Sequence, residues 1–513
     1  MIRFILMMAA LTCWPAVARA DWHEVSSPHF VIYADDKPER IHSFAEALER
    51  FDQAVRVLRR LPNTPVNPAS RVTIYVAGSD ARIAKFAGSQ GIAGFYAGRA
   101  SGSVAFIPKL ETGDSLMTGQ LVLFHEYSHH LMMTHYAQAA FPLWLTEGWA
   151  EFHATAKVSP RGDVSFGHAA NHRSYGILRD KIALEQVLKG FDGINPLNMD
   201  SFYGRSWLLT HYLSVDAGRI EQFARYIDEI NKGTPALQAA KVFGDLKAMD
   251  RELNRYSRKS LLIRTVPAER ITIGRITSRP LTPGEAALMT VRMESHSGVT
   301  QKTAPRVYAA AKKAAAPYPD EPAVQIVLAE TAFDAGLYSE TLAACERALT
   351  RDPKAMDALI YKAMAMIQIA KLDKAPPERW TEIRRVIAAA NQLDRDHPEP
   401  LILYYASFEE ADQKPTDLAS LGLQRAFELA PFDSGLRFKT ASMLIDHGRA
   451  DTARSILAPL AYDPHDLRVA KRAQDMIAGI DAKPGASGAA PDAKGKSLDR
   501  RPQPPAAVPS LWR

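Results

Sequence analysis

A recurring helical unit in the second half of the chain constrains its fold more than any other feature. Between about residues 304 and 480, short amphipathic segments of helical period alternate with turns that contain proline. The marking prolines are spaced 34, 45, 33 and 33 residues apart, at Pro319, Pro353, Pro398, Pro431 and Pro464. Two short helices cannot bury their apolar faces alone, so units of this length must stack on one another. We therefore expect an all-α solenoid over residues 304–480, with an insertion of about eleven residues near Lys371 to Trp380.

The unit from Val324 to Pro353 shows the repeat most clearly. Small residues recur on both sides of a turn at Gly336, at Ala329, Ala332, Ala343 and Ala348. This pattern resembles a tetratricopeptide repeat (TPR), whose period is about 34 residues. The resemblance implies a TPR-like domain whose concave face binds a protein partner. A generic alanine-rich helical bundle is the alternative.

The first half of the chain has an α+β pattern. Strand-like segments lie at residues 29–33 (HFVIY), 71–77 (RVTIYVA) and 103–108 (SVAFIP), and a helix is expected from Ile41 to Leu61, before Pro62. From Leu116 to about Ile263 the pattern is almost wholly helical, including residues 201–212 and 221–231. We expect a domain over residues 21–263 and a linker over residues 264–303. Pro280 and Pro283 in this segment are typical of breaks between regular elements.

Both ends of the chain differ from these domains. Residues 1–20 have Arg3, an apolar run from Phe4 to Leu11 and the sequence Ala18-Arg19-Ala20, which is typical of a secretory signal cleaved after Ala20. An uncleaved N-terminal anchor is the alternative. This signal predicts export to the periplasm or the medium. No later stretch is apolar for long enough to span a membrane, so the mature chain is expected to be soluble. Residues 481–513 are rich in Pro, Gly and Ala and predict a disordered tail.

Composition narrows the classes of partner. Hydrophobic residues make up 47% of the chain, which is enough for sizeable cores. The formal charge of +6 is small for 513 residues, and no basic patch with interleaved aromatic residues is present, so we expect no nucleic-acid partner. Removal of the signal leaves one cysteine, Cys345, and therefore no internal disulfide.

The candidate chemistry lies between Leu121 and Phe152. Residues 125–129 read HEYSH, an HExxH motif. Residues four apart share one face of a helix, so the imidazoles of His125 and His129 converge on one divalent metal, with Glu126 beside the bound water. Glu147 follows His129 by eighteen residues, on a second expected helix after Pro142, and would complete three ligands with one open position. Catalytic zinc requires such an open position.

HExxH followed by the segment W-L-T-E-G-W-A at residues 144–150 resembles the gluzincin metallopeptidases. That group contains thermolysin and the aminopeptidase N-like enzymes, and the closer similarity is to bacterial peptidase-MA-like proteins, some of which carry TPRs. The resemblance covers roughly residues 28–260 and implies a thermolysin-like α+β domain, Zn²⁺ and Glu147 as third ligand. Seventeen residues separate His129 from Glu147, against eighteen in the aminopeptidase N-like enzymes. Glu151 lies one helical turn beyond Glu147 and could reach the same side, so it is the rival ligand. Otherwise Glu151 hydrogen-bonds a ligating histidine and fixes its tautomer.

The function that follows is hydrolysis of a peptide bond by a zinc-bound water, with Glu126 as general base. Tyr203, with His211 behind it, is the candidate donor to the oxyanion, although an ordinary core tyrosine would look the same. The resemblance also implies an edge strand that aligns the substrate, at residues 103–108. The alternative for this segment is a strand of the core sheet, and both can hold together. The glycine-rich stretch 91–102 is expected to be a flexible turn that lines the cleft, and His130, His135 and His153 are expected to be packing or surface histidines.

Three functions remain open. The first is an exported zinc metallopeptidase that acts on a peptide or protein substrate. An endopeptidase is preferred, because no acidic group that would anchor a substrate amino terminus is evident. The second is a non-catalytic TPR scaffold or assembly protein with a retained protease-like domain. The third is a zinc hydrolase of a cell-wall peptide or another amide.

Overall fold

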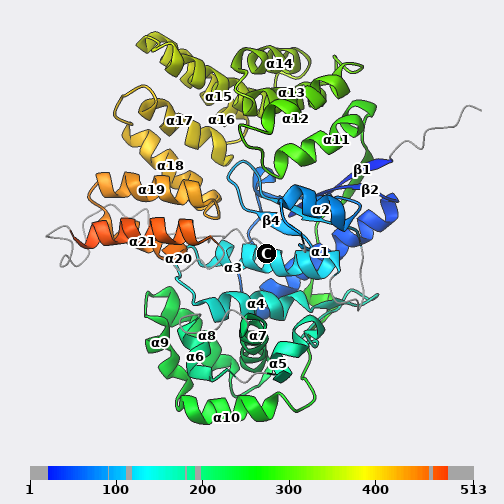
Figure 1. Cartoon of the computed structure of the whole chain (residues 1–513), viewed down its shortest axis with the longest axis vertical. Helices are drawn as coiled ribbons and strands as arrows, with labels where there is room; N and C mark the ends of the chain where they lie inside the picture. Colours follow the sequence, from blue (N-terminus) through cyan, green and yellow to red (C-terminus); the bar gives the residue numbers. More distant parts are fainter. Residues whose placement is uncertain are drawn as a thin grey trace, which may run out of the picture.

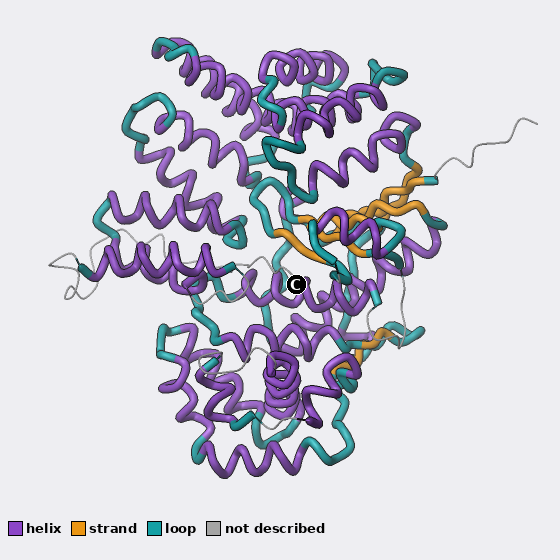
Figure 2. The backbone as a smooth tube through the Cα atoms, in the orientation of Figure 1, coloured by secondary structure: helices purple, strands orange, loops and turns teal. Residues whose placement is uncertain are grey.

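The computed structural model describes residues 21–90, 92–110, 118–179, 182–190, 198–461 and 466–482. The expected signal segment, the tail beyond residue 482 and the marker Pro464 lie outside the described residues. The strands of the described residues belong to one part of the molecule, which an arc of helices from the second half of the chain flanks (Figures 1 and 2). Within the described ranges, no helix is both long enough and apolar enough to span a bilayer.

A six-stranded sheet is the centre of the N-terminal part. Its spatial order is β4 (Phe95–Ala97), β5 (Val104–Ile107), β3 (Val72–Val76), β2 (Phe30–Asp35), β1 (Trp22–Ser26) and β9 (Thr277–Pro280). Strands β2, β3 and β5 run parallel and correspond to the three strands predicted from the sequence. Strand β5 is internal, because β3 and β4 pair with its two sides. The prediction that residues 103–108 form a substrate-aligning edge is therefore wrong, and the alternative, a strand of the core sheet, is confirmed. The edge strand is β4, which lies within the glycine-rich stretch that was expected to be a turn.

Alternation of side chains along the strands builds a core on each face of this sheet. Ile32 and Ile74 contribute to the core with helices α1 (Pro38–Arg59) and α3 (Gly119–His135). Tyr33, Tyr75 and Phe106 contribute to the opposite core, with α2 (Asp80–Ala87) and α11 (Pro283–His296). Helix α3, which carries HExxH, is consequently buried over most of its length.

Helices dominate the region that follows, as predicted. They are α4 (Leu143–Ala154), α5 (Ser174–Arg179), α6 (Leu184–Lys189), α7 (Met199–Val215), α8 (Ile220–Asn231), α9 (Ala236–Ala239) and α10 (Leu246–Tyr256). The region also contains two strands of a small sheet, β6 (Lys157–Val158) and β7 (Val164–Phe166), which β8 (Arg264–Val266) completes. Strands of two or three residues are too short to show an alternating pattern, so the sequence did not reveal them.

The segment 264–303 is part of the folded structure rather than a free linker. It contributes β8 to the small sheet and β9 to the main sheet, where β9 pairs with β1. Helix α11 then joins the two halves, because Met289 and Met293 pack on the sheet while Leu288 and Val291 pack against the next helices. The prolines of this segment mark strand and helix ends and do not separate two independent units.

The repeat region consists of successive helices, each packed on its neighbours in the chain. They are α12 (Ala304–Ala315), α13 (Pro322–Asp334), α14 (Tyr338–Arg351), α15 (Met356–Leu372), α16 (Pro377–Leu393), α17 (Pro398–Glu409), α18 (Asp417–Leu429), α19 (Ser434–Asp446), α20 (Ala450–Ala461) and α21 (Leu467–Asp481). Gly336 forms the predicted turn between α13 and α14 with φ of 74°. The inserted residues lengthen α15 and α16, which have 17 residues each. These helical pairs form the predicted TPR-like architecture.

Candidate metal centre

Two neighbouring helices carry the candidate ligands. The hydroxyl of Thr118 caps α3 by accepting a hydrogen bond from the amide of Leu121 at 3.1 Å. Pro142 precedes the first residue of α4, as the sequence predicted. Figure 1 shows α3, α4 and α7 as successive layers below the sheet.

His125, His129 and Glu147 converge in the interior. The two Nε2 atoms are 3.1 Å apart, and the carboxylate oxygens of Glu147 lie 3.7 Å from His125 Nε2 and 3.8 Å from His129 Nε2. Donor atoms of a tetrahedral zinc site are separated by about 3.3 Å, given bonds of roughly 2.0 to 2.2 Å. All three side chains are only 2% exposed. Their size, chemistry and spacing therefore fit one zinc ion.

Gly148 explains how Glu147 is brought to this point. A Cβ atom at Gly148 would lie 2.3 Å from the hydroxyl oxygen of Thr210 and 2.5 Å from the carbonyl oxygen of Ser206, both on α7. Only glycine therefore lets α4 pack this closely against α7. The glycine of the E-G-W-A segment is thus a packing requirement next to the candidate ligand.

Glu151 lies on the other side of His125, away from the triangle of ligand atoms. Its carboxylate accepts hydrogen bonds from His172 at 2.6 Å and from Arg173 at 2.7 Å, and one oxygen lies 3.8 Å from His125 Nδ1. Nδ1 is the nitrogen opposite the one that faces His129 and Glu147. This position suits the role predicted for Glu151 as the group that orients His125.

The electrostatics of the centre favour neutral imidazole and ionised carboxylate. Burial lowers the pKa of His125, against the opposing effect of Glu151 and Glu147. Burial alone would raise the pKa of Glu151, but Arg173 and His172 hold that pKa well below its usual value. A metal ion binds only the unprotonated imidazole. Because the lowered pKa keeps His125 neutral, a metal can bind it without displacing a proton.

Glu126, the predicted base, is 1% exposed and follows His125 on α3. Burial, and after it the negative charge of the Glu126 carboxylate, raise the pKa of the Tyr96 hydroxyl on the edge strand β4.

Tyr203 lies beside the centre on α7. Burial, then the negative charges of Glu147 and Glu151, raise the pKa of its hydroxyl, and the Arg173 guanidinium lies 4.9 Å from its ring centre. The hydroxyl therefore stays protonated at neutral pH. His211 has a different place: its Nε2 donates to the carbonyl of Gly167 at 3.0 Å, and Tyr256 donates to its Nδ1 at 2.9 Å. Both nitrogens are engaged in the core, so His211 does not support Tyr203.

Sequence reasoning missed His172 and Arg173. They lie 21 and 22 residues after Glu151, in the 3₁₀ turn η2 (Asn171–Arg173), and no spacing rule marks them. The other histidines have the expected packing roles: His130 bonds the hydroxyl of Tyr96, His135 contacts Arg56, and His153 accepts from Arg59.

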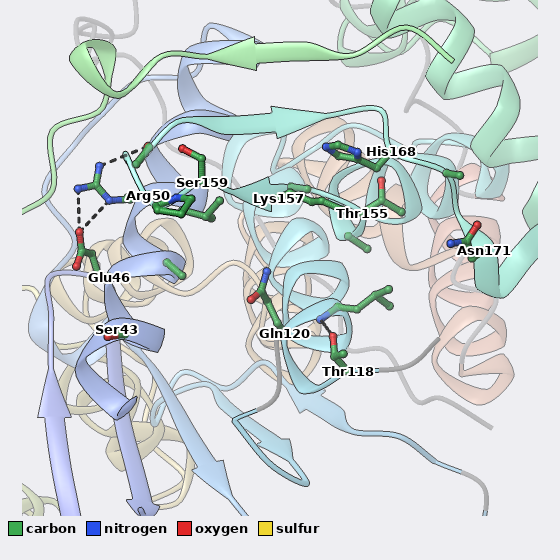
Figure 3. Close-up of a pocket in the computed structure, with 18 of the residues that line it drawn as sticks. Ser43, Glu46, Arg50, Thr118, Gln120, Thr155, Lys157, Ser159, His168 and Asn171 are labelled. Atoms are coloured by element: carbon green, nitrogen blue, oxygen red, sulfur yellow. Dashed lines mark hydrogen bonds and ion pairs between the residues drawn. The ribbon is translucent and has the colours of Figure 1, made fainter. Parts of the chain in front are cut away.

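A cavity of about 790 Å³ adjoins the centre. Its lining comes from the start of α3, the end of α4, residues 157–160, Gly162 and part of α1. His172 also lines it and hydrogen-bonds Glu151. Glu46 and Arg50 form an ion pair at one end, while His168 and Asn171 lie at the other (Figure 3). None of the three candidate ligands lines this cavity, which therefore lies behind His125 and not over the metal triangle.

Comparisons with known proteins bear only on the repeats. No family model and no curated protein sequence matches the chain. A thermophilic TPR protein of Thermus thermophilus is similar over 38% of this chain and 99% of its own, with 16% identity and a TM-score of 0.33. PilF of Pseudomonas aeruginosa is similar over 39% of this chain and 88% of its own, with 12% identity and a TM-score of 0.30. The MamA fragment of Desulfovibrio magneticus has 13% identity over 38% of this chain and 97% of its own, with a TM-score of 0.27.

Proposed function

We propose that the chain is a gluzincin-type zinc metallopeptidase whose TPR-like repeats bind a protein. The observation that carries this proposal is the convergence of His125, His129 and Glu147 within 4.8 Å of one another, with Glu126 adjacent on the same helix. A structural zinc site would normally have a fourth protein ligand, whereas this cluster contains three among the described residues. Three ligands and a neighbouring carboxylate make up the donor set of a hydrolytic centre.

Each residue then has a defined role. A zinc ion at this cluster supplies Lewis acidity toward a peptide carbonyl and a water molecule. The Glu126 carboxylate takes the proton of the attacking water and returns it to the leaving amine. The Tyr203 hydroxyl, which stays protonated, donates to the oxygen of the scissile carbonyl as negative charge develops. Glu151 holds His125 in the orientation that presents Nε2 to the metal.

The edge strand β4 is the proposed guide for substrate. Among the described residues it pairs with β5 alone, and an extended peptide can pair with its other side. This mode of binding suits a chain that continues on both sides of the cleaved bond, in agreement with an endopeptidase. The signal-like first twenty residues support the periplasm or the medium as the place of action.

The test is to compare the purified native chain with Glu126→Gln. We expect about one zinc per chain in both, and cleavage of an unfolded protein substrate only by the native chain. Glu378→Gln, at an exposed position of α16, is the matched control and should cleave normally. If the zinc-loaded native chain and the zinc-loaded Glu126→Gln variant show the same activity toward the substrate, the peptidase proposal is refuted and the non-catalytic scaffold is favoured.

A further inference from the structure

One short segment of the repeat region contacts three elements that surround the candidate metal centre. The segment comprises Phe432 to Arg437, where the chain enters α19. Its three partners are helix α3, the connection between α3 and α4, and the hairpin loop that follows the edge strand β4. These partners lie some 300 residues earlier in the chain, so the contacts belong to the tertiary structure alone.

The first contact is made by Phe432, which is 3% exposed. Its ring centre lies 5.1 Å from that of His130, the residue after His129 on α3. Its Cβ would lie 3.3 Å from a Cβ placed on Gly98, so the hairpin loop also packs against it. Phe432 therefore occupies the corner between the ligand helix and the loop.

The second contact is made by Asp433, the N-cap of α19. One carboxylate oxygen accepts from the amide of Leu436 at 2.8 Å and thereby caps the helix. The other oxygen accepts from the amide of Ala100 in the β4–β5 loop at 3.0 Å. One side chain thus holds the start of α19 against the loop that follows the edge strand.

The third contact is made by Arg437, which is 1% exposed. One of its terminal nitrogens donates to the carbonyl of Ala137 at 2.8 Å and to that of Ile456 at 2.7 Å, and the other donates to the carbonyl of Pro431 at 2.8 Å. Burial lowers its pKa to about 9, so it remains a cation at neutral pH. Ala137 lies in the seven-residue connection from Tyr136 to Pro142 between α3 and α4. A buried guanidinium with three backbone acceptors strongly resists displacement of any of them.

We propose that the Phe432–Arg437 segment positions the two ligand helices and the edge strand, so that the repeat region is a structural part of the metal centre. The inference rests on the proposed function of the His125–His129–Glu147 cluster. Arg437 is a positioning residue: it sets the connection that determines how α4 presents Glu147 to the histidines of α3. A partner that binds the repeats and moves α19 would therefore change the metal centre without touching it.

The test compares Arg437→Met with Arg384→Met, a matched arginine of α16. Each of these arginines lies over a phenylalanine ring. Arg384 donates to Ser407 and Gln413, so its hydrogen bonds all stay within the repeats. Amide hydrogen exchange is measured on the full, metal-free chains. We expect Arg437→Met to speed exchange across residues 119–154, and Arg384→Met to speed it only around α16 and α17.

Cobalt(II) titration provides a second readout. Arg437→Met should lose about tenfold or more in cobalt affinity and show altered visible absorption, as when groups that orient metal ligands are removed. Arg384→Met should retain the native affinity and spectrum. Asp433→Asn is a milder variant, because one amide oxygen cannot accept from both Leu436 and Ala100; it should change the same residues to a smaller extent.

If the amide hydrogen exchange rates over residues 119–154 are equal in Arg437→Met and Arg384→Met, the inference is overturned. A native chain that binds no cobalt overturns the proposed function instead, and the exchange comparison then decides alone whether the segment holds α3 and α4. The two failures are therefore distinguishable.

Discussion

Adding one methyl group at Gly148 should weaken the metal centre from a distance. In Gly148→Ala the new Cβ would lie 2.5 Å from the backbone carbonyl oxygen of Ser206, whereas ordinary contacts begin at 3.4 Å. Helices α4 and α7 must therefore separate by about 0.9 Å, or tilt to the same effect. Overpacking of this kind costs roughly 1–3 kcal/mol. Glu147 is the preceding residue, so its carboxylate moves relative to His125 and His129 by a distance that exceeds the tolerance of a zinc bond, about 0.2 Å.

We expect Gly148→Ala to lose about tenfold or more in zinc affinity, measured by competition with a chromophoric chelator. Chemical unfolding of the metal-free chain should show a loss of about 1–3 kcal/mol. Gly479→Ala is the control, because its Cβ would meet nothing within 4 Å. It lies inside α21, and alanine there should stabilise the helix by about 0.5–1 kcal/mol without a change in zinc affinity. Native zinc affinity in Gly148→Ala would refute the idea that α7 sets the position of Glu147.

Three further outcomes follow from the same structure. Glu151→Gln leaves the Arg173 guanidinium, which is only 13% exposed, beside a neutral amide, so the free energy of unfolding in urea should fall by about 3 kcal/mol; an unchanged value would contradict the pairing. Tyr203→Phe should lower kcat by about 10²-fold at unchanged zinc content, whereas a normal kcat would assign Tyr203 to the core. Burial and the charges of Asp433 and Asp357 raise the pKa of Glu399 from 4.5 to about 7. Between these pKa values the folded chain holds a proton on Glu399 that the unfolded chain has lost, so the free energy of unfolding should decrease between about pH 5 and pH 8. Glu399→Gln should flatten that decline in unfolding curves at the two pH values, and an unaltered slope would exclude Glu399 as its source.

The sequence determined the elements whose pattern is local. Three strands, the long helix before Pro62, the two ligand helices and the paired helices of the repeats all follow from alternation, helical period and the positions of proline and glycine. The spacing of His125 and His129 places both on one face of a helix, and α3 confirms this. Such features need only neighbours within a few residues, so the sequence contains enough information to predict them.

Tertiary structure decided everything that depends on which distant segments meet. Three such features are the pairing of β4 with β5 at the edge of the sheet, the pairing of β9 with β1, and the hydrogen bonds from His172 and Arg173 to Glu151. The residues in each of these pairs are not related by any regular spacing in the sequence. The contact of Arg437 with Ala137 spans 300 positions. Burial of apolar surface drives such contacts, and this driving force has no preferred direction. The sequence therefore shows which apolar faces must be buried, but only the folded structure shows which segment packs on each face.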